Sequence, residues 1–424
     1  MTRLRRPFAP LHGPAYRRFF TGQAFARTSV WVQSVAELWL VLKLTGSGVS
    51  LGLTTALQFA PMLLFGAWAG LLADRLSKRR ILLFAQAWMV VPAAALFVLT
   101  ASGAIELWMV YLLVLARGFG HAVDNPVRQA FLSEVVEPGL IPASVSLNAA
   151  LVSSARMLGP AIGGVLIAAA GVVPCFAVAT AGFIVAWLAL VALRPQSLTV
   201  SEPIPREPGQ LRQGLRHVRS EPSLLIPLAA MAVVGTLAFN FPVLLPLMAR
   251  FEFHSGAGTF GALAAAMGVG AVLGALTNAS RSRAPTLADL GLLALCFGAF
   301  TALLVAAPSL PLAFAALVCV GAASTTFAAT TNSLLQLGAE PHLRGRVMAM
   351  FSVVYLGSTP LGGPIVGWVA EHAGPRAGFA LGAAATLLTG VAILFLARGQ
   401  ATAWLSSARA RATTLSARWA GTSS

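Results

Sequence analysis

Charged residues are scarce in this sequence: they make up 10% of its 424 residues, and only 13 of them are acidic against 29 basic ones. Soluble domains carry charge on about a quarter of their residues, so a chain that is 57% hydrophobic lacks the polar surface of a soluble protein. The three cysteines, Cys175, Cys296 and Cys319, have no metal-ligand spacing. No GxxxxGK[ST] or HExxH pattern occurs either, so we expect no metal, no cofactor and no nucleotide-driven activity.

Long apolar windows dominate what remains, and each is long enough to cross a bilayer as a helix. They begin near Phe19, Leu51, Ile81, Leu107, Val145, Val173, Leu224, Phe260, Leu287, Leu312, Val347 and Ala377. At about 22 residues each they use about 264 residues, which leaves short loops, one linker and two tails. The first window contains Arg27 and Glu37 and lacks a cleavage site, so we expect a retained helix rather than a signal peptide. The sequence therefore predicts an all-α integral membrane protein of twelve helices.

The basic residues of the chain, whose net charge is +16, fall on alternate loops. Most of them lie in one set of segments: 3–18, 70–80, 206–219, 281–283, 344–346 and the tail 398–418. The opposite loops hold only Lys43, Arg250 and Arg376. By the positive-inside rule we expect a multi-pass membrane protein with both termini in the cytoplasm. No aromatic residues interleave with the basic ones as they do on nucleic-acid-binding surfaces, so we expect no nucleic-acid partner.

A Pro- and Ser-rich segment near Pro195 divides the chain into two parts. We expect a six-helix half at 1–194, a cytoplasmic linker at 195–221, a second six-helix half at 222–398 and a basic cytoplasmic tail at 399–424. The end of the linker has one apolar and one basic face, which fits an interfacial helix or a solvated one equally well. Gly159, Pro160 and Gly163 align with Gly363, Pro364 and Gly367, so the halves form a parallel repeat, as in transporters that rock around a central site.

The run GLLADRLSKRR at 70–80 places five charges directly after an apolar stretch and indicates a short cytoplasmic loop. It resembles the signature loop of the major facilitator superfamily. The matching residues are Gly70, Leu72, Ala73, Asp74, Arg75, Lys78, Arg79 and Leu82, while Ser77 replaces the second glycine. The resemblance implies a latch in which Asp74 and its basic neighbours stabilise the state closed to the cytoplasm. A loop that only anchors the topology is the alternative.

Other segments narrow this resemblance to one subgroup of the superfamily. LKLTGSGVSLGL, DNPVRQAFLSEVV and LRGRVMAMFSVVYLGSTPLGG resemble the subgroup that contains the enterobactin exporter, macrolide efflux pumps and a lysophospholipid flippase. In MLGPAIGGVL, residues Gly159, Pro160, Gly163 and Gly164 resemble a fifth-helix motif associated with exporters. The proline introduces a kink and the glycines allow close packing, so the segment is a candidate hinge. Ordinary helix packing explains Gly163 and Gly164 equally well.

The fourth window concentrates polar residues inside the membrane. Arg117, His121, Asp124 and Arg128 are spaced by three or four residues and share one helical face. A charge within a bilayer needs a partner or water, so this face must meet a polar interior. Arg117 resembles in position the fourth-helix arginine that the superfamily associates with proton coupling. A structural role is the alternative for the other residues: Asp124 and Arg128 can form an ion pair that holds the helix end, and His121 can simply pack inside the protein.

Glu37 is the sharper candidate for proton coupling, together with Arg117, Asp124 and His121. It lies in an apolar span one turn after Gln33, where a carboxyl group can gain and lose a proton as access alternates. The alternative is a carboxylate in the outer headgroup region, because Lys43 follows within two turns.

The second half contributes candidate substrate residues. The resemblance implies that helices 1, 4, 7 and 10 line a cavity, to which Gln33, Phe239, Asn240, Thr326 and Asn332 would contribute. Amides, hydroxyls and aromatic rings with little fixed charge suit a bulky, partly apolar solute. Hydrogen bonds between helices explain many of these residues equally well.

We therefore expect a secondary transporter, not an enzyme, because the 117–128 cluster offers no pair of nucleophile and base. As the resemblance implies, it would lie in the bacterial cytoplasmic (inner) membrane and export an amphipathic, drug-like or siderophore-like small molecule by alternating access, in exchange for protons and as a monomer among membrane lipids. The alternatives are a lipid flippase and a non-transporting membrane sensor.

Overall fold

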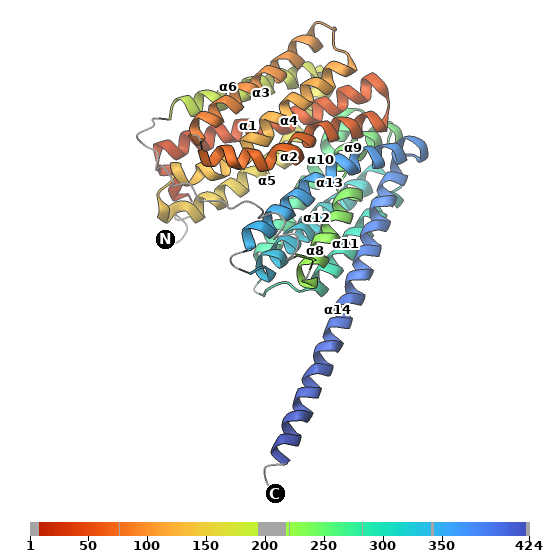
Figure 1. The fold of residues 1–424 in the computed structure, drawn as a ribbon. Coiled ribbons are helices and arrows are strands. Elements are labelled where there is room, and N and C mark those ends of the chain that lie inside the picture. The colour runs from red at the N-terminus through yellow and green to blue at the C-terminus, as the bar shows by residue number, and fades with distance from the viewer. Residues whose placement is uncertain are drawn as a thin grey trace.

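A computed structural model describes residues 8–75, 77–193, 218–219, 221–281, 283–340 and 343–420, with side chains except at 66–75, 138, 356 and 398–420. Most of the expected linker, 195–221, lies outside the described residues. We call residues 8–193 the first half and residues 218–420 the second half. In Figure 1 the first half runs from red to yellow and the second from green to blue, and the two halves lie side by side.

The described residues form helices and no strand, which confirms the predicted all-α class. The first half contains η1 (Ala9–His12), α1 (Pro14–Thr45), α2 (Gly48–Arg75), α3 (Lys78–Ala101), α4 (Leu107–Val135), η2 (Pro138–Leu140), α5 (Ile141–Ala170) and α6 (Val173–Val191). The second contains α8 (Pro222–Leu237), α9 (Phe241–Leu247), η4 (Met248–Glu252), α10 (Ala257–Ala279), α11 (Leu287–Ala306), α12 (Leu310–Gly338), α13 (Arg344–Ala373) and α14 (Pro375–Ala420).

Eleven helical segments of the described residues are long and apolar enough to cross a bilayer. α1 has 32 residues and is long enough to be a twelfth, but Gln33, Glu37 and Lys43 make it more polar than the others. One of the eleven, Pro222–Glu252, is interrupted after α8 and continues as α9 and the π-helix η4. Pro242 lies in the first turn of α9, where its missing N–H and its restriction of Phe241 favour a helix start.

Two helix pairs make the largest contacts between the halves: α2 packs against α13, and α5 packs against α10. α9 adds smaller contacts with α1 and α2. Glycines make these contacts close. A Cβ added at Gly52 of α2 would overlap the carbonyl group of Gly363 in α13, and one added at Gly164 of α5 would lie 2.6 Å from the Cα of Gly261 in α10. Backbone contact of this kind requires the absence of a side chain on both helices. These glycines therefore hold the halves together in the observed conformation.

The polar contacts between the halves, within the described residues, lie at one end of the bundle. Glu371 near the end of α13 accepts hydrogen bonds from the Ser47 hydroxyl (2.5 Å) and the Val49 N–H (2.9 Å) at the start of α2. Arg250 donates to the Leu42 carbonyl at 3.0 Å, and the rings of Trp39 and Phe260 stack at 6.2 Å. We call this the closed end; it contains the α1–α2 turn and the α9–α10 connection.

Candidate functional site

A buried ion pair joins α1 and α4 inside the first half. Arg117 Nη2 lies 2.5 Å from Glu37 Oε2, and Arg117 Nε donates to Glu37 Oε1 at 3.1 Å. Both side chains are 1% exposed. Gln33 Nε2 also donates to Glu37 Oε1 at 2.8 Å, and Arg117 contacts the Ser34 hydroxyl at 3.4 Å. The carboxylate thus has two-point contact with a guanidinium and one amide donor.

The sequence positions this pair through helix periodicity and glycine. Gln33 and Glu37 are four residues apart, so they lie on one face of α1. A Cβ at Gly118 would lie 2.7 Å from the Gln58 carbonyl oxygen of α2, and one at Gly120 would lie 2.7 Å from the Met89 side chain of α3. α4 therefore packs closely against both neighbours. Because Glu37 is enclosed by protein, it is not a headgroup carboxylate.

A second polar cluster lies about 10 Å farther along α4, seven residues after Arg117. Arg128 donates from Nε to Asp124 Oδ2 at 2.8 Å and pairs with its other oxygen through Nη2, while Gln86 of α3 donates to Asp124 at 2.8 Å. His121 is half-buried and makes no hydrogen bond with the described residues. The arrangement contains the Asp124–Arg128 pair expected from sequence, and it leaves the role of His121 a prediction.

The basic loop is described only in part: Gly70, Asp74 and Arg75 fall among the residues whose side chains lie outside the described structure. Lys78 pairs with Glu134 at 2.6 Å, and Arg79 donates to the Val191 carbonyl at 2.9 Å. Both contacts stay within the first half and anchor the loop to α4 and α6. The latch remains a prediction.

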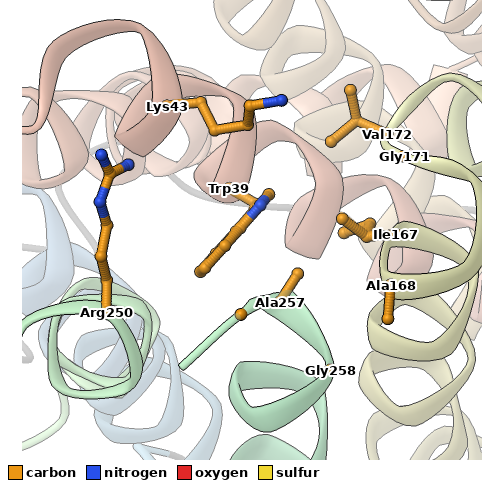
Figure 2. A pocket seen from close by; sticks show the side chains of 10 residues that line it. Trp39, Lys43, Ile167, Ala168, Gly171, Val172, Arg250, Ala257 and Gly258 are labelled. Atoms are coloured by element: carbon orange, nitrogen blue, oxygen red, sulfur yellow. The ribbon is translucent and has the colours of Figure 1, made fainter. Parts of the chain in front are cut away.

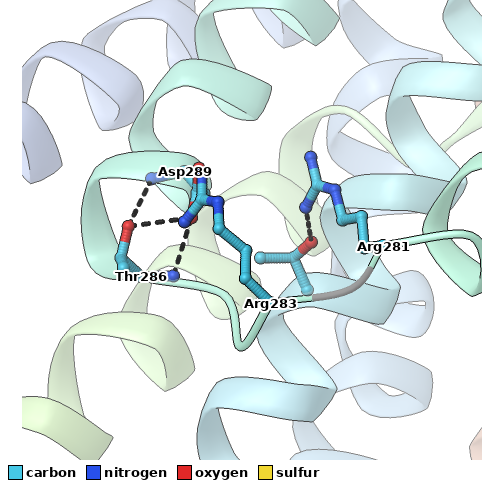
Figure 3. A network of polar contacts seen from close by, with 5 residues as sticks. Arg281, Arg283, Thr286 and Asp289 are labelled. Carbon is cyan, nitrogen blue, oxygen red and sulfur yellow. Dashed lines mark hydrogen bonds and ion pairs between the residues drawn. The ribbon is translucent and has the colours of Figure 1, made fainter.

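The corresponding loop of the second half joins α10 to α11, and its described contacts also stay within its own half (Figure 3). Arg283 donates to both oxygens of Asp289, at 2.9 and 2.6 Å, and Thr286 forms a capping box with Asp289 at the start of α11. Arg281 donates to Thr330 at 3.4 Å. This loop is likewise tied to helices of its own half.

The helix interruption brings Asn240 into the core of the second half. Asn240 is fully buried; its Nδ2 donates to the Thr236 carbonyl at 2.7 Å, and its Oδ1 has no partner among the described residues. Phe239 is half-buried and packs against Phe297 at 5.6 Å and Tyr355 at 5.9 Å. Interrupted membrane helices offer such unpaired polar groups to ligands.

Thr326 and Asn332 make contacts within the protein. Thr326 donates to the Ala322 carbonyl (2.8 Å) or the Gly274 carbonyl (3.2 Å) and thereby links α12 to α10, while Asn332 accepts from Gln336 at 2.8 Å. Their substrate roles therefore remain predictions, beside a packing role that these contacts describe.

The fifth-helix motif packs against two neighbours. Gly159 and Gly163 face Trp31 and Val35 of α1, while Gly164 meets Gly261 of α10. α5 continues as one helix through Pro160. The packing interpretation of the motif therefore holds, and the hinge remains a prediction.

Arg156 is a candidate that the sequence reasoning missed. It is an exposed cation in the middle of α5, and its guanidinium lies 5.5 Å from the centre of the Trp31 ring of α1. No carboxylate of the described residues pairs with it. A lone arginine in an apolar helix was the available signal, since such residues mark functional sites in membrane proteins.

A pocket of about 560 Å³ opens at the closed end, between the halves (Figure 2). Trp39 and Lys43 of α1 and Arg250 of η4 line it, and in this view Trp39 lies between Arg250 and the residues of α5. The remaining wall is small or aliphatic: Ile167, Ala168, Gly171, Val172, Gly256, Ala257 and Gly258.

Residues 5–419 match the sequence pattern of the family described as "Transmembrane secretion effector". The multidrug efflux pump Tap of Mycolicibacterium fortuitum is 28% identical over 377 residues, 86% of this chain and 91% of that protein. The enterobactin exporter EntS of Salmonella typhi is 24% identical over 391 residues, 90% of this chain and 92% of that protein. The staphyloferrin A transporter of Staphylococcus aureus is 31% identical over 151 residues, 35% of this chain and 38% of that protein.

The structure is similar to the crystal structure of a bacterial homologue of the human lysosomal transporter Spinster, described as inward-facing and unoccupied. The TM-score is 0.68 at 18% identity, and the match covers 94% of this chain and 96% of that one. At this identity the similarity shows the fold alone.

Proposed function

This chain belongs to the transmembrane secretion effector family of the major facilitator superfamily, and from this membership we propose that it exports an amphipathic small molecule in exchange for protons. It is a multi-pass membrane transporter and not an enzyme. The observation that carries the proton coupling is the Glu37–Arg117 pair, the most deeply buried ion pair among the described residues. Export agrees with the similarity to the efflux pump Tap and the enterobactin exporter EntS and with the Gly-Pro motif of α5.

The positive-inside rule supports an orientation with both termini in the cytoplasm. The closed end then faces outward and the opposite end faces the cytoplasm. The inter-half contacts of Glu371, Arg250 and Gly52 all close the outward side, which fits an inward-facing state. Alternating access requires these contacts to break and the halves to close at the other end, where Asp74, Arg75, Lys78 and Arg79 are the proposed latch.

Proton coupling follows from the groups around Glu37. The ionised carboxylate holds Arg117 in place, and protonation removes the charge that keeps the two helices paired. Gln33 can serve both states, because its amide offers a donor to the carboxylate and an acceptor to the carboxylic acid. Its Oε1 is buried and has no partner among the described residues. Asp124 and His121 lie between Arg117 and the cytoplasmic end of α4 and form a proposed proton path.

The proposal is tested by proton movement in everted membrane vesicles, after addition of a panel of amphipathic drugs and siderophores. Proton release triggered by a compound, and absent from vesicles without the protein, supports antiport. Transport of a compound without any proton movement contradicts the coupling. Absence of any response to the whole panel contradicts the substrate class and favours a lipid substrate.

Alternating access predicts a strong effect at Gly52. A leucine at this position overlaps the Gly363 backbone, so we expect Gly52→Leu to hold the outward end open and to abolish transport. The reporter is Phe260→Cys in a background without native cysteines, because Phe260 is 2% exposed and stacks on Trp39 across the interface. A membrane-impermeant maleimide added to intact cells should label this cysteine faster in Gly52→Leu.

Gly139→Leu is the matched control, since a Cβ at Gly139 meets no atom within 4 Å. It should transport normally and leave the reporter protected. Normal transport by Gly52→Leu would show that the observed contact is not part of the cycle.

A further inference from the structure

We propose that the pocket formed by Trp39, Lys43 and Arg250 is a binding site for an anionic aromatic group. Its assignment to the exit side of the transporter rests on the proposed function. The site combines two cations with an indole ring at the mouth of the interface between the halves. This chemistry indicates a class of substrate, which the buried Glu37–Arg117 pair of the first half does not.

The first argument for an anionic ligand is the distribution of charge at the closed end. Of the three Lys and Arg residues expected on this side, Arg376 pairs with Glu252 at 2.8 Å. Glu371 keeps its negative charge, because its partners Ser47 and Val49 are neutral, but it does not line the pocket. Lys43 and Arg250 pair with no carboxylate of the described residues, and both line this pocket. Two uncompensated cations beside one small cavity produce a positive potential that attracts an anion.

The second argument, for an aromatic ligand, is the size and lining of the pocket. Its volume of about 560 Å³ lies within the range of small-molecule sites, about 300 to 1,000 Å³. Besides Trp39 and the two cations, the lining consists of glycine, alanine, Ile167 and Val172, and a Cβ at Gly256 would meet no atom within 4 Å. Flat walls and an indole accommodate a planar ring, while Lys43 and Arg250 can bind its acidic substituent.

A similar pairing of a cation with an indole occurs farther along α1, between α1 and α5 of the first half. Trp31, Val35, Trp39 and Lys43 follow one another at intervals of four residues and therefore form one face of α1. Arg156 lies over Trp31, about 12 Å before Trp39 along the helix. Val35 is buried against Gly163 of α5, so the two ends of this face each combine an aromatic ring with a cation that has no carboxylate partner among the described residues. This repetition favours an anionic aromatic substrate over a cationic one.

The test measures binding of 2-naphthalenesulfonate and of neutral 2-naphthol to the full-length protein in nanodiscs, by equilibrium dialysis. We expect the sulfonate to bind about tenfold more tightly, with an advantage that decreases as salt rises. Arg250→Gln and Lys43→Gln should each reduce sulfonate affinity and leave naphthol affinity unchanged. Arg376→Gln removes one guanidinium from the same end without touching the pocket, and it should bind the sulfonate like the wild type.

Gly256→Leu provides a second variant that keeps both cations but fills the pocket, and it should lose sulfonate binding. Equal sulfonate affinity in the wild type, Arg250→Gln and Gly256→Leu would overturn the proposal. Glu37→Gln separates the two hypotheses, since it should still bind the sulfonate. Intact substrate-driven proton release with no sulfonate binding would reject the pocket and keep antiport; the reverse result would reject antiport and keep the pocket.

Discussion

Glu37→Gln is expected to reduce substrate-driven proton release in everted vesicles to the level of vesicles without the protein. Glutamine keeps the shape of the side chain and still accepts a hydrogen bond from Arg117, but it cannot exchange a proton. Substrate binding should survive, because Glu37 is enclosed between α1 and α4 and is 1% exposed. The measurement follows the pH inside or outside the vesicles as substrate is added.

Glu134→Gln is the matched control for this experiment. Glu134 is also a largely buried carboxylate of the first half paired with a cation, Lys78, at 2.6 Å. It lies at the loop end of α4, away from the Glu37–Arg117 pair, and its substitution should leave proton release near the wild-type level. If Glu37→Gln releases protons normally, coupling must be sought at the Asp124 cluster.

The helices could be predicted because a membrane-spanning helix requires a continuous apolar segment, and such a segment is a local property of the sequence. Windows starting near Leu107, Val173 and Leu287 coincide with the first residues of α4, α6 and α11. The interruption at Asn240 was not predicted. A continuous helix and an interrupted one have the same apolar composition, so the length of the window does not distinguish them. Pro242 and Pro246 were the available signals, and each is also compatible with a continuous, kinked membrane helix.

The site could be predicted only residue by residue. Glu37, Arg117 and Asp124 are polar residues in apolar helices, which single-sequence reasoning detects. Glu37 and Arg117 are 80 residues apart in the sequence. Their contact depends on how α1 packs against α4, which no local sequence pattern determines. Arg156 was missed although its signal is of the same kind. Arg250 entered the sequence reasoning only as an exception to the topology rule, and Lys43 entered it as such an exception and as a marker of the membrane surface near Glu37.

The conformational state lay beyond sequence reasoning for a physical reason. A transporter that alternates must have contacts of comparable free energy at both ends of its interface, so its sequence encodes both closures. Here the described contacts of Gly52, Gly164 and Glu371 show one closure. The loop motif at 70–80 predicts the other.

Arg117→Gln is expected to destabilise the protein by about 3 to 5 kcal/mol, because it leaves the Glu37 carboxylate buried without its cation. Unfolding is followed in detergent with a denaturant series. Arg376→Gln is the matched control: its pair with Glu252 is 38% and 23% exposed, so Glu252 stays in contact with solvent when the guanidinium is lost. Arg376 also donates to the Val305 and Ala307 carbonyls, and we expect its loss to cost less than that of the buried Arg117.

The double variant Glu37→Gln/Arg117→Gln should recover most of the lost stability, because two neutral amides can hydrogen-bond where a single unpaired charge cannot. It should remain unable to couple substrate to protons. This combination of restored folding and lost coupling would show that the charged pair is retained for transport rather than for stability. A double variant as unstable as Arg117→Gln alone would indicate instead that the pair is a structural link between α1 and α4.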